Sequence, residues 1–456
     1  IENYNESYLN DIFQKIPNFK KNKFFSILKY KLYIGDIKSN LFFNKCIKSF
    51  NKKKSIKVAK SKLNNNSPKI KKPDFKNIVA LLHFARSGTG LMHSLIDDHS
   101  EVSTLPSIYF SHFFDKSMWE KIITDGCENI IDNFISAYPV FFDARSSRPV
   151  ADKKDYIENV GIKEGMTNLG NGKNEYLYID KNLFKTELAS MIKKYDNLDQ
   201  MTFFKLVHLA YEKVINNHHK KEIIFYHIHN PRADVLFNFI NHAPNAKWLV
   251  MVRDPVEGCE AWISQLFNEN NYTDIVQRIV AVLLDVNNNL YKNRDVVGLR
   301  LEDLKYNPRY IIPLLCSWMG IKEEETLYKM TAQGKKWWGD KSSPEQEAFG
   351  KISKKKLGTV FNVRDRFILE TLFYPFRVKF NYVEENTKRY EKDLKVVRPM
   401  INEVFDFEKK IINQLKINTE QFKKSEMFLY FRSILIERWN ILNQSKTYPN
   451  MLKKLQ

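Results

Sequence analysis

The clearest hydrophobic pattern along the chain is a set of short apolar runs, rich in β-branched residues and bounded by polar or turn-forming residues. Such runs predict buried β-strands. Longer stretches with apolar residues at helical spacing lie between them, as at Thr186–Tyr195 and Tyr272–Tyr291. Strands that alternate with helices are typical of an α/β fold with a central parallel sheet flanked by helices. We expect strands at Ile78–Leu82, Ile223–Ile228, Trp248–Val252 and Val296–Leu299.

The two ends of the chain have a different pattern from this central region. Residues 1–72 are rich in Lys and Asn, and they read as a basic, partly helical segment and linker. Residues 73–383 form the predicted folded domain. Residues 384–456 are charged and periodic with few Gly or Pro, so we expect an almost wholly helical extension. These helices pack on the core or pair with a second copy as a homo-oligomer.

Composition changes this picture mainly through charge. Hydrophobic residues make up 43% of the 456 residues, enough for a sizeable core, and the formal net charge is +20. This excess favours anionic partners such as nucleic acid, a membrane surface, an acidic polysaccharide or a nucleotide. A solvated, lysine-rich surface explains it equally well.

Compartment and metal content are constrained only weakly. The four cysteines, at 46, 127, 259 and 316, match no zinc or redox spacing, which favours a reducing, cytoplasmic setting. We find no apolar run of the length a membrane helix needs. The sequence begins at Ile1, so an upstream signal or anchor stays open.

The segment after the first predicted strand carries the strongest chemical signal. The strand runs into Arg86-Ser87-Gly88-Thr89-Gly90-Leu91, and an apolar helical pattern follows. Backbone N–H groups and the positive end of the helix dipole then meet at one spot, which suits a phosphate. The Walker pattern is absent because no Lys follows Gly90, which argues against an ordinary ATPase or kinase. A plain turn between strand and helix remains the alternative.

The segment from Arg86 to Leu91, together with Leu95–Ser103 after it, resembles the 5′-phosphosulfate loop of the sulfotransferases that use 3′-phosphoadenosine 5′-phosphosulfate (PAPS). The sequence departs from that pattern at Gly90, which replaces a Thr, and at Ser100, which replaces a Pro. The resemblance implies a P-loop NTPase-like fold, PAPS as co-substrate, 3′,5′-ADP as product and no metal. It assigns nucleotide binding to Arg86, Ser87, Gly88, Thr89, Gly90 and Leu91.

A second block, Pro244–Glu257, resembles the element of this family that binds the 3′-phosphate. It implies that Arg253 contacts this phosphate, which suits a side chain that donates two parallel hydrogen bonds. The family's second ligand is a Ser eight residues later, where this chain has Ala261. Ser264 lies one helical turn further on the same face and is our candidate replacement.

Two weaker resemblances extend the match to residues 78–382, about two thirds of the chain. Val297–Pro308 resembles the family's strand followed by Glu-Asp-Leu and Asn-Pro. Gly334–Lys341 resembles the loop that closes over the nucleotide, which assigns Trp338 and Gly339 to that role.

The candidate proton acceptors are His227 and His229, which lie at the end of a predicted strand and share one face of it. In cytosolic members of the family, a catalytic His stands two residues before a Pro. Pro231 therefore selects His229 as the base, although some members place a sulfuryl-contacting Lys there. Arg86 is the candidate for meeting charge on the leaving phosphate. A structural histidine pair is the alternative, and His99, His208 and Glu101 are further candidates.

We therefore predict sulfuryl transfer from PAPS to a hydroxyl or amine of an acceptor such as a carbohydrate or glycolipid. We expect no nucleic-acid partner, and peripheral membrane contact through the basic N-terminal segment. Trp119, Tyr138 and Phe141 either stack on sugar rings or belong to the core. The alternatives are an inactive nucleotide- or polyanion-binding module and a P-loop kinase with a degenerate Walker motif.

Overall fold

The computed structural model describes residues 56–57, 73–106, 110–124, 126–149, 157–217, 219–229, 233–292, 294–341, 343–344, 347–350, 352 and 357–456. The predicted N-terminal helices and the role of Pro231 fall outside the described residues.

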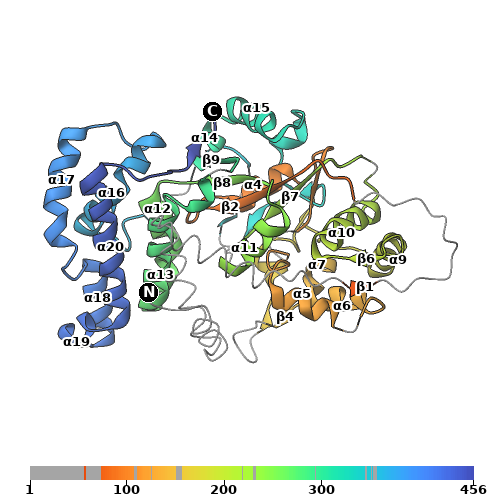
Figure 1. Ribbon diagram of the computed structural model, residues 1–456, viewed down its shortest axis with the longest axis horizontal. Coiled ribbons are helices and arrows are strands. Elements are labelled where there is room, and N and C mark those ends of the chain that lie inside the picture. The colour runs from red at the N-terminus through yellow and green to blue at the C-terminus, as the bar shows by residue number, and fades with distance from the viewer. Residues whose placement is uncertain are drawn as a thin grey trace, which may run out of the picture.

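A six-stranded sheet forms the centre of the molecule (Figure 1). Its order is β14-β9-β8-β2-β7-β3, and every pair of neighbours is parallel. The four predicted strands are all present in this sheet, so the predicted α/β class is confirmed. The strands span Asn77–His83 (β2), Val102–Thr104 (β3), Ile223–His227 (β7), Lys247–Val252 (β8), Val296–Arg300 (β9) and Lys453–Lys454 (β14).

Side chains alternate between two buried faces along each central strand, as the pleat requires. In β8, Trp248 and Val250 belong to one hydrophobic cluster, whereas Leu249 and Met251 belong to the other. Strands buried on both faces read as continuous apolar runs, which is why the sequence revealed them.

The helices divide unequally between these faces. One face is covered by α4 (Thr89–Ile96), α14 (Leu301–Tyr306) and α15 (Pro308–Met319). The opposite face of the sheet packs against α10, α11, α12, α13 and α16. Figure 1 shows α11 and α15 on opposite sides of the sheet. The bounds on this side are Gln200–Val214 (α10), Ala233–His242 (α11), Pro255–Asn268 (α12), Tyr272–Asp285 (α13) and Val363–Lys379 (α16).

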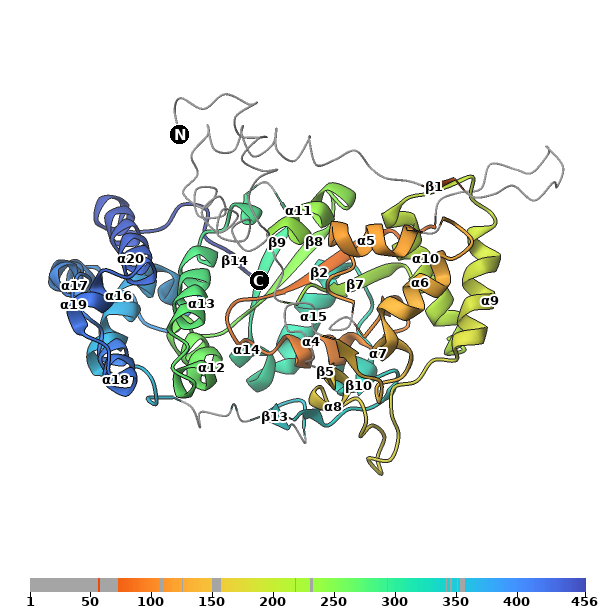
Figure 2. The same cartoon turned by 90° about the horizontal axis from the view of Figure 1, so that it is seen from below.

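The C-terminal helices lie at one end of the molecule, and α5, α6, α9 and α10 lie at the other (Figures 1 and 2). The predicted helical C-terminal addition is present as four helices, which pack on α13 and α16. The chain then returns to the sheet, where β14 extends its edge beside β9. The C-terminal helices are Thr387–Met400 (α17), Asp406–Leu415 (α18), Thr419–Lys423 (α19) and Glu426–Ser445 (α20).

The remaining elements are short connections and one aromatic-rich lobe. Trp119, Tyr138 and Phe141 lie buried in this lobe, as core residues. The helices here are Lys116–Ile123 (α5), Ile130–Ala137 (α6), Pro139–Phe142 (α7), Val160–Lys163 (α8) and Lys181–Ile192 (α9); two 3₁₀ turns span Asn289–Tyr291 (η2) and Glu325–Tyr328 (η3). The small two-stranded pairs are β1–β6 (Ile56–Lys57, Asn197–Leu198), β4–β5 (Arg148–Pro149, Ile157–Glu158), β10–β11 (Thr331–Ala332, Lys335–Lys336) and β12–β13 (Gly339–Asp340, Ser343–Pro344).

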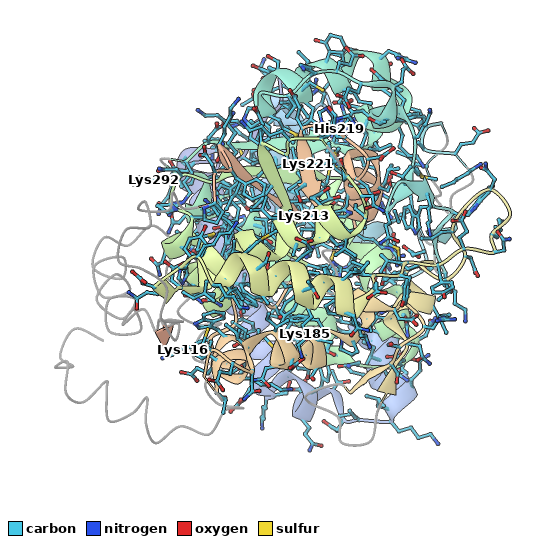
Figure 3. All side chains as sticks on the ribbon, turned by 90° about the vertical axis from the view of Figure 1, so that its right-hand side faces the viewer. Lys116, Lys185, Lys213, His219, Lys221 and Lys292 are labelled. Carbon is cyan, nitrogen blue, oxygen red and sulfur yellow. The ribbon has the colours of Figure 1, made fainter. Side chains whose placement is uncertain are left out.

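Lysine side chains lie scattered over the side of the molecule that carries α9 and α10 (Figure 3). The lysines labelled in Figure 3 lie apart from one another on this side. Lys185 pairs with Asp132 at 2.7 Å, and Lys213 pairs with Glu187 at 2.8 Å. Among the described residues, no helix combines the length and apolar character needed to cross a bilayer.

Candidate functional site

The loop between β2 and α4 is held in a fixed shape by its own backbone and by β8. The Phe84 N–H donates to the Met251 carbonyl at 2.9 Å and to Ser87 Oγ at 3.3 Å. Ala85 and Gly88 both have positive φ, 55° and 83°. The two left-handed residues turn the chain so that α4 begins at Thr89, directly after the loop. The strand–loop–helix geometry predicted for a phosphate cradle is therefore present.

Gly88 suits this position through its small size as well as its backbone angle. A β-carbon on Gly88 would lie 2.7 Å from Leu301 Cδ1, closer than van der Waals contact allows. Leu301 begins α14, directly after β9. The segment that resembles the family's Glu-Asp-Leu element thus packs directly against the loop.

Arg253 follows β8, whose neighbour in the sheet is β2. Only 7% of the Arg253 surface is exposed, and Glu257, one helical turn later, lies 3.7 Å away. Gly258 lies between the two motifs, since a β-carbon there would be 3.2 Å from Ala85 Cβ and 3.6 Å from Arg253 Cβ. The loop and the buried guanidinium therefore share one corner of the sheet.

Asp254, the residue after Arg253, has a structural role. Asp254 caps α12 by accepting hydrogen bonds from the Val256 and Glu257 N–H groups, and it pairs with Arg377 at 2.9 Å. Such a cap fixes the start of a helix. The side chain after Arg253 is thus used to position α12.

Glu260 is a buried anchor that the sequence analysis missed. Its carboxylate accepts from the backbone of Gly358, Val360 and Phe361 at 2.9–3.0 Å and pairs with Arg366 at 2.7 Å. It joins the helix that follows Arg253 to the segment entering α16. The residues next to Glu260 in the sequence give no sign of partners about a hundred positions away.

Ala261 and Ser264 lie on α12 beyond this corner. Ala261 is buried, and the Ser264 hydroxyl donates to the Ala261 carbonyl at 3.4 Å. Nothing in this geometry tests whether Ser264 replaces the family's serine, so that assignment stays a prediction.

A second arginine, missed from the sequence, lies close to Arg86. Arg278 of α13 stacks over Trp262, 5.0 Å from its centroid, and donates to the Trp262 carbonyl. Burial lowers the pKa of Arg278; the neighbouring Asp274, Cys259 and Glu269 act in the opposite direction, and Arg86 adds a smaller lowering effect. Arg278 and Arg86 therefore influence each other, in surroundings that also contain acidic side chains.

Four histidines gather where β2, β7 and α4 meet. The ring centroids of His227 and His229 are 5.4 Å apart. The ring of His83 lies 5.9 Å from that of His229, and the ring of His93 lies 6.2 Å from that of His227. His227 is only 4% exposed, and its Nε2 has no hydrogen-bond partner among the described residues. Burial and the three neighbouring rings hold the pKa of His227 well below 6.5. His227 is thus neutral at pH 7, as a general base must be. In the part of the chain that the structure describes, no cluster of His, Cys, Asp or Glu forms a metal site.

His227 lines a pocket that begins at the loop, and we call it the His227 pocket. Its free volume is about 50 Å³. Gly90 joins it to the phosphate loop, whereas His229 is not among its lining residues. The pocket is lined by Gly90, His93, Ser94, Asp97, Pro106, Glu164, Met166, Leu177, Tyr211, His227, Thr331, Ala332, Gln333 and Trp337.

The segment predicted to close over the nucleotide lies beside α4. Trp337 is buried, and its ring lies 3.6 Å from where a β-carbon on Gly90 would be. Trp338 instead donates to the Gly170 carbonyl at 2.8 Å, and Lys336 lies 3.8 Å from the centroid of its ring. Gly339 has φ 83° and packs against Gly165. Of these two tryptophans, Trp337 is the one that lies against the loop, and the sequence analysis did not select it.

The remaining candidate bases have structural contacts elsewhere. His99 contacts the Lys322 carbonyl at 2.8 Å, and Glu101 accepts from the Lys322 N–H at the same distance. His208 contacts Ser103 Oγ at 2.9 Å, and burial lowers its pKa to about 3. None of the three lines the His227 pocket.

Comparisons with known proteins give solved structures only. No family model matches the chain, and no curated protein matches it in sequence. The chain is similar to a sulfotransferase domain of the olefin synthase from Synechococcus PCC 7002, with 14% identity, a TM-score of 0.31, and coverage of 57% of this chain and 80% of that one. A sulfotransferase domain from the curacin biosynthetic pathway shows 12% identity, a TM-score of 0.30, and coverage of 76% and 99%. A sulfotransferase from Mycobacterium tuberculosis H37Rv shows 11% identity, a TM-score of 0.25, and coverage of 56% and 70%. At these values the likeness carries no statement about reaction or substrate.

Proposed function

We propose that this protein is a sulfotransferase that moves the sulfuryl group of PAPS to a hydroxyl or amine of an acceptor. The observation that carries the proposal is the convergence of three separate segments on one corner of the sheet. Leu301 packs on Gly88, and Gly258 fits between Ala85 and Arg253. The carboxyl ends of β2, β8 and β9 therefore meet at the phosphate loop, where open parallel sheets bind their ligands.

The residues at this corner fit a nucleotide with phosphates at both its 5′ and 3′ positions. The loop offers backbone N–H groups at the start of a helix, and Gly88 in this loop packs against Leu301. Arg253 supplies a separate, buried guanidinium suited to a terminal phosphate. In this proposal the loop residues hold the phosphosulfate and Arg253 holds the 3′-phosphate.

PAPS supplies an activated sulfuryl group, and the protein must position it and stabilise charge. Arg86 meets the negative charge that grows on the leaving phosphate. A neutral histidine of the His227–His229 pair takes the acceptor proton.

Nucleotide selectivity tests the proposal. Calorimetric titration should show 3′,5′-ADP binding at least tenfold more tightly than 5′-AMP, because only the former carries the phosphate that Arg253 recognises. Arg253→Gln should remove most of this difference. Arg309→Gln is the matched control, because Arg309 forms a solvent-exposed pair with Glu325 and its replacement should leave the preference intact.

Equal affinity of the wild-type protein for the two nucleotides would refute the 3′-phosphate assignment. A preference that survives in Arg253→Gln would move the 3′-phosphate site elsewhere. The inactive-module alternative predicts the same binding without turnover, so it is separated from the proposal only by an assay of transfer.

A further inference from the structure

The His227 pocket has a charge pattern opposite to that of the phosphate corner. Its two charged lining residues, Asp97 and Glu164, are both acidic, and no Lys or Arg is among the described residues that line it. Asp97 is fixed in place, because it accepts from the Gly334 N–H at 2.9 Å and from Thr104 Oγ1 at 3.2 Å. The ammonium group of Lys221 does not line the pocket. It lies 3.8 Å from the Glu212 carboxylate and donates to the His99 carbonyl.

An unpartnered polar group marks this pocket as a binding site. The Nε2 atom of His227, which is nine-tenths buried, has no partner among the described residues. The Nε2 atom of His93, on α4, is also buried without a hydrogen-bond partner among the described residues. Buried polar atoms without partners are costly, so a ligand that hydrogen-bonds there is favoured.

The remaining walls determine the shape of a fitting ligand. Trp337, Met166, Leu177 and Pro106 supply apolar surface. The free volume of about 50 Å³ has room for about four water-sized atoms. This space suits the end of a chain better than a ring.

We propose that the acceptor enters this pocket through a narrow, hydroxyl-bearing group that is neutral or cationic, and that His227 accepts its proton. The inference rests on the proposed function and deepens it by naming the acceptor class and the base. It differs from the acidic glycan suggested by the overall charge and from the choice of His229 suggested by sequence.

The step balances without any further reactant. The acceptor oxygen bonds to sulfur as the bond between sulfur and the bridging oxygen of the 5′-phosphate breaks. The electron pair of the broken bond leaves with the phosphate of 3′,5′-ADP. The hydroxyl proton passes to His227 and from there to solvent.

Three chain-like alcohols of similar size test the charge preference: 4-amino-1-butanol (cationic), 1-pentanol (neutral) and 4-hydroxybutyrate (anionic). Transfer of radiolabelled sulfuryl from PAPS should give kcat/KM in this order, with at least a tenfold difference between the cationic and anionic alcohols. Asp97→Asn, which keeps the size of the side chain and removes its charge, should shrink that difference at least threefold. Asp98→Asn is the matched control, because Asp98 is exposed and does not line the pocket.

Preference for the anionic alcohol, or equal effects of the two aspartate variants, would overturn the inference. A protein that binds 3′,5′-ADP but transfers sulfuryl to none of the three alcohols would also overturn the inference. In that case the assignment of the nucleotide site would still stand. Failure to bind 3′,5′-ADP would instead remove the proposed function itself.

Discussion

The phosphate corner and the His227 pocket meet at Gly90, yet they are built in different ways. The corner uses contiguous segments at the ends of adjacent strands, with the loop after β2 and Arg253 after β8. The pocket draws on α4, β7, the segment around Glu164 and the turn around Gln333, which are far apart in the chain. The corner holds the buried guanidinium of Arg253, whereas the charged residues that line the pocket, Asp97 and Glu164, are acidic. Under the proposed function, this difference would separate recognition of the anionic donor from recognition of its acceptor.

The largest expected effect comes from replacing His227, the histidine that faces the pocket. His227→Gln should lower the transfer rate by about 10²–10⁴-fold, the usual worth of a positioned base, and leave 3′,5′-ADP affinity unchanged. His229→Gln should cost less, since His229 does not line the pocket. A larger loss in His229→Gln would return the role of base to the residue that the sequence favoured.

The pH profile gives the same histidine a second readout. His93 of α4, His83 of β2 and His229, which lies just after β7, surround His227, and Asp97 lies near His93. Burial and the neighbouring rings lower the pKa of His227, so its neutral, active form persists below pH 6.5. The acid limb of kcat/KM should therefore fall below pH 6.5 in the wild-type protein and disappear in His227→Gln.

Replacing Arg86 tests the other region. Arg86→Ala should slow the chemical step by about 10²–10³-fold, as expected for a group that meets charge growing on the leaving phosphate. Affinity for 3′,5′-ADP should change much less, since that product lacks the breaking bond. Single-turnover kinetics and calorimetry measure the two quantities separately. Normal turnover with weakened binding would show that Arg86 only holds the nucleotide.

The same contrast explains how much the sequence revealed. The four long strands and the phosphate loop could be predicted, because apolar runs and a Gly-rich turn are local signals. The pairing of Lys453 and Lys454 with β9 could not, since two lysines at a sheet edge carry no strand pattern. Asp97 and Trp337 were missed as pocket residues for a related reason. Only tertiary folding brings them to His227.

Glu260 shows the same limit for the scaffold. A carboxylate in the middle of a helical pattern reads as a solvated residue. The structure buries it completely and surrounds it with three backbone N–H groups and Arg366. Its partners lie about a hundred residues away in the chain, so no local pattern announces them.

Turnover of PAPS compared with ATP is the most direct test of the central claim. The purified protein should convert PAPS to 3′,5′-ADP in the presence of 4-amino-1-butanol and a metal chelator, with the sulfuryl group recovered on the alcohol. ATP should not be consumed under the same conditions or with magnesium, because the loop lacks the Walker lysine. Magnesium-dependent consumption of ATP without turnover of PAPS would contradict the account and favour a kinase.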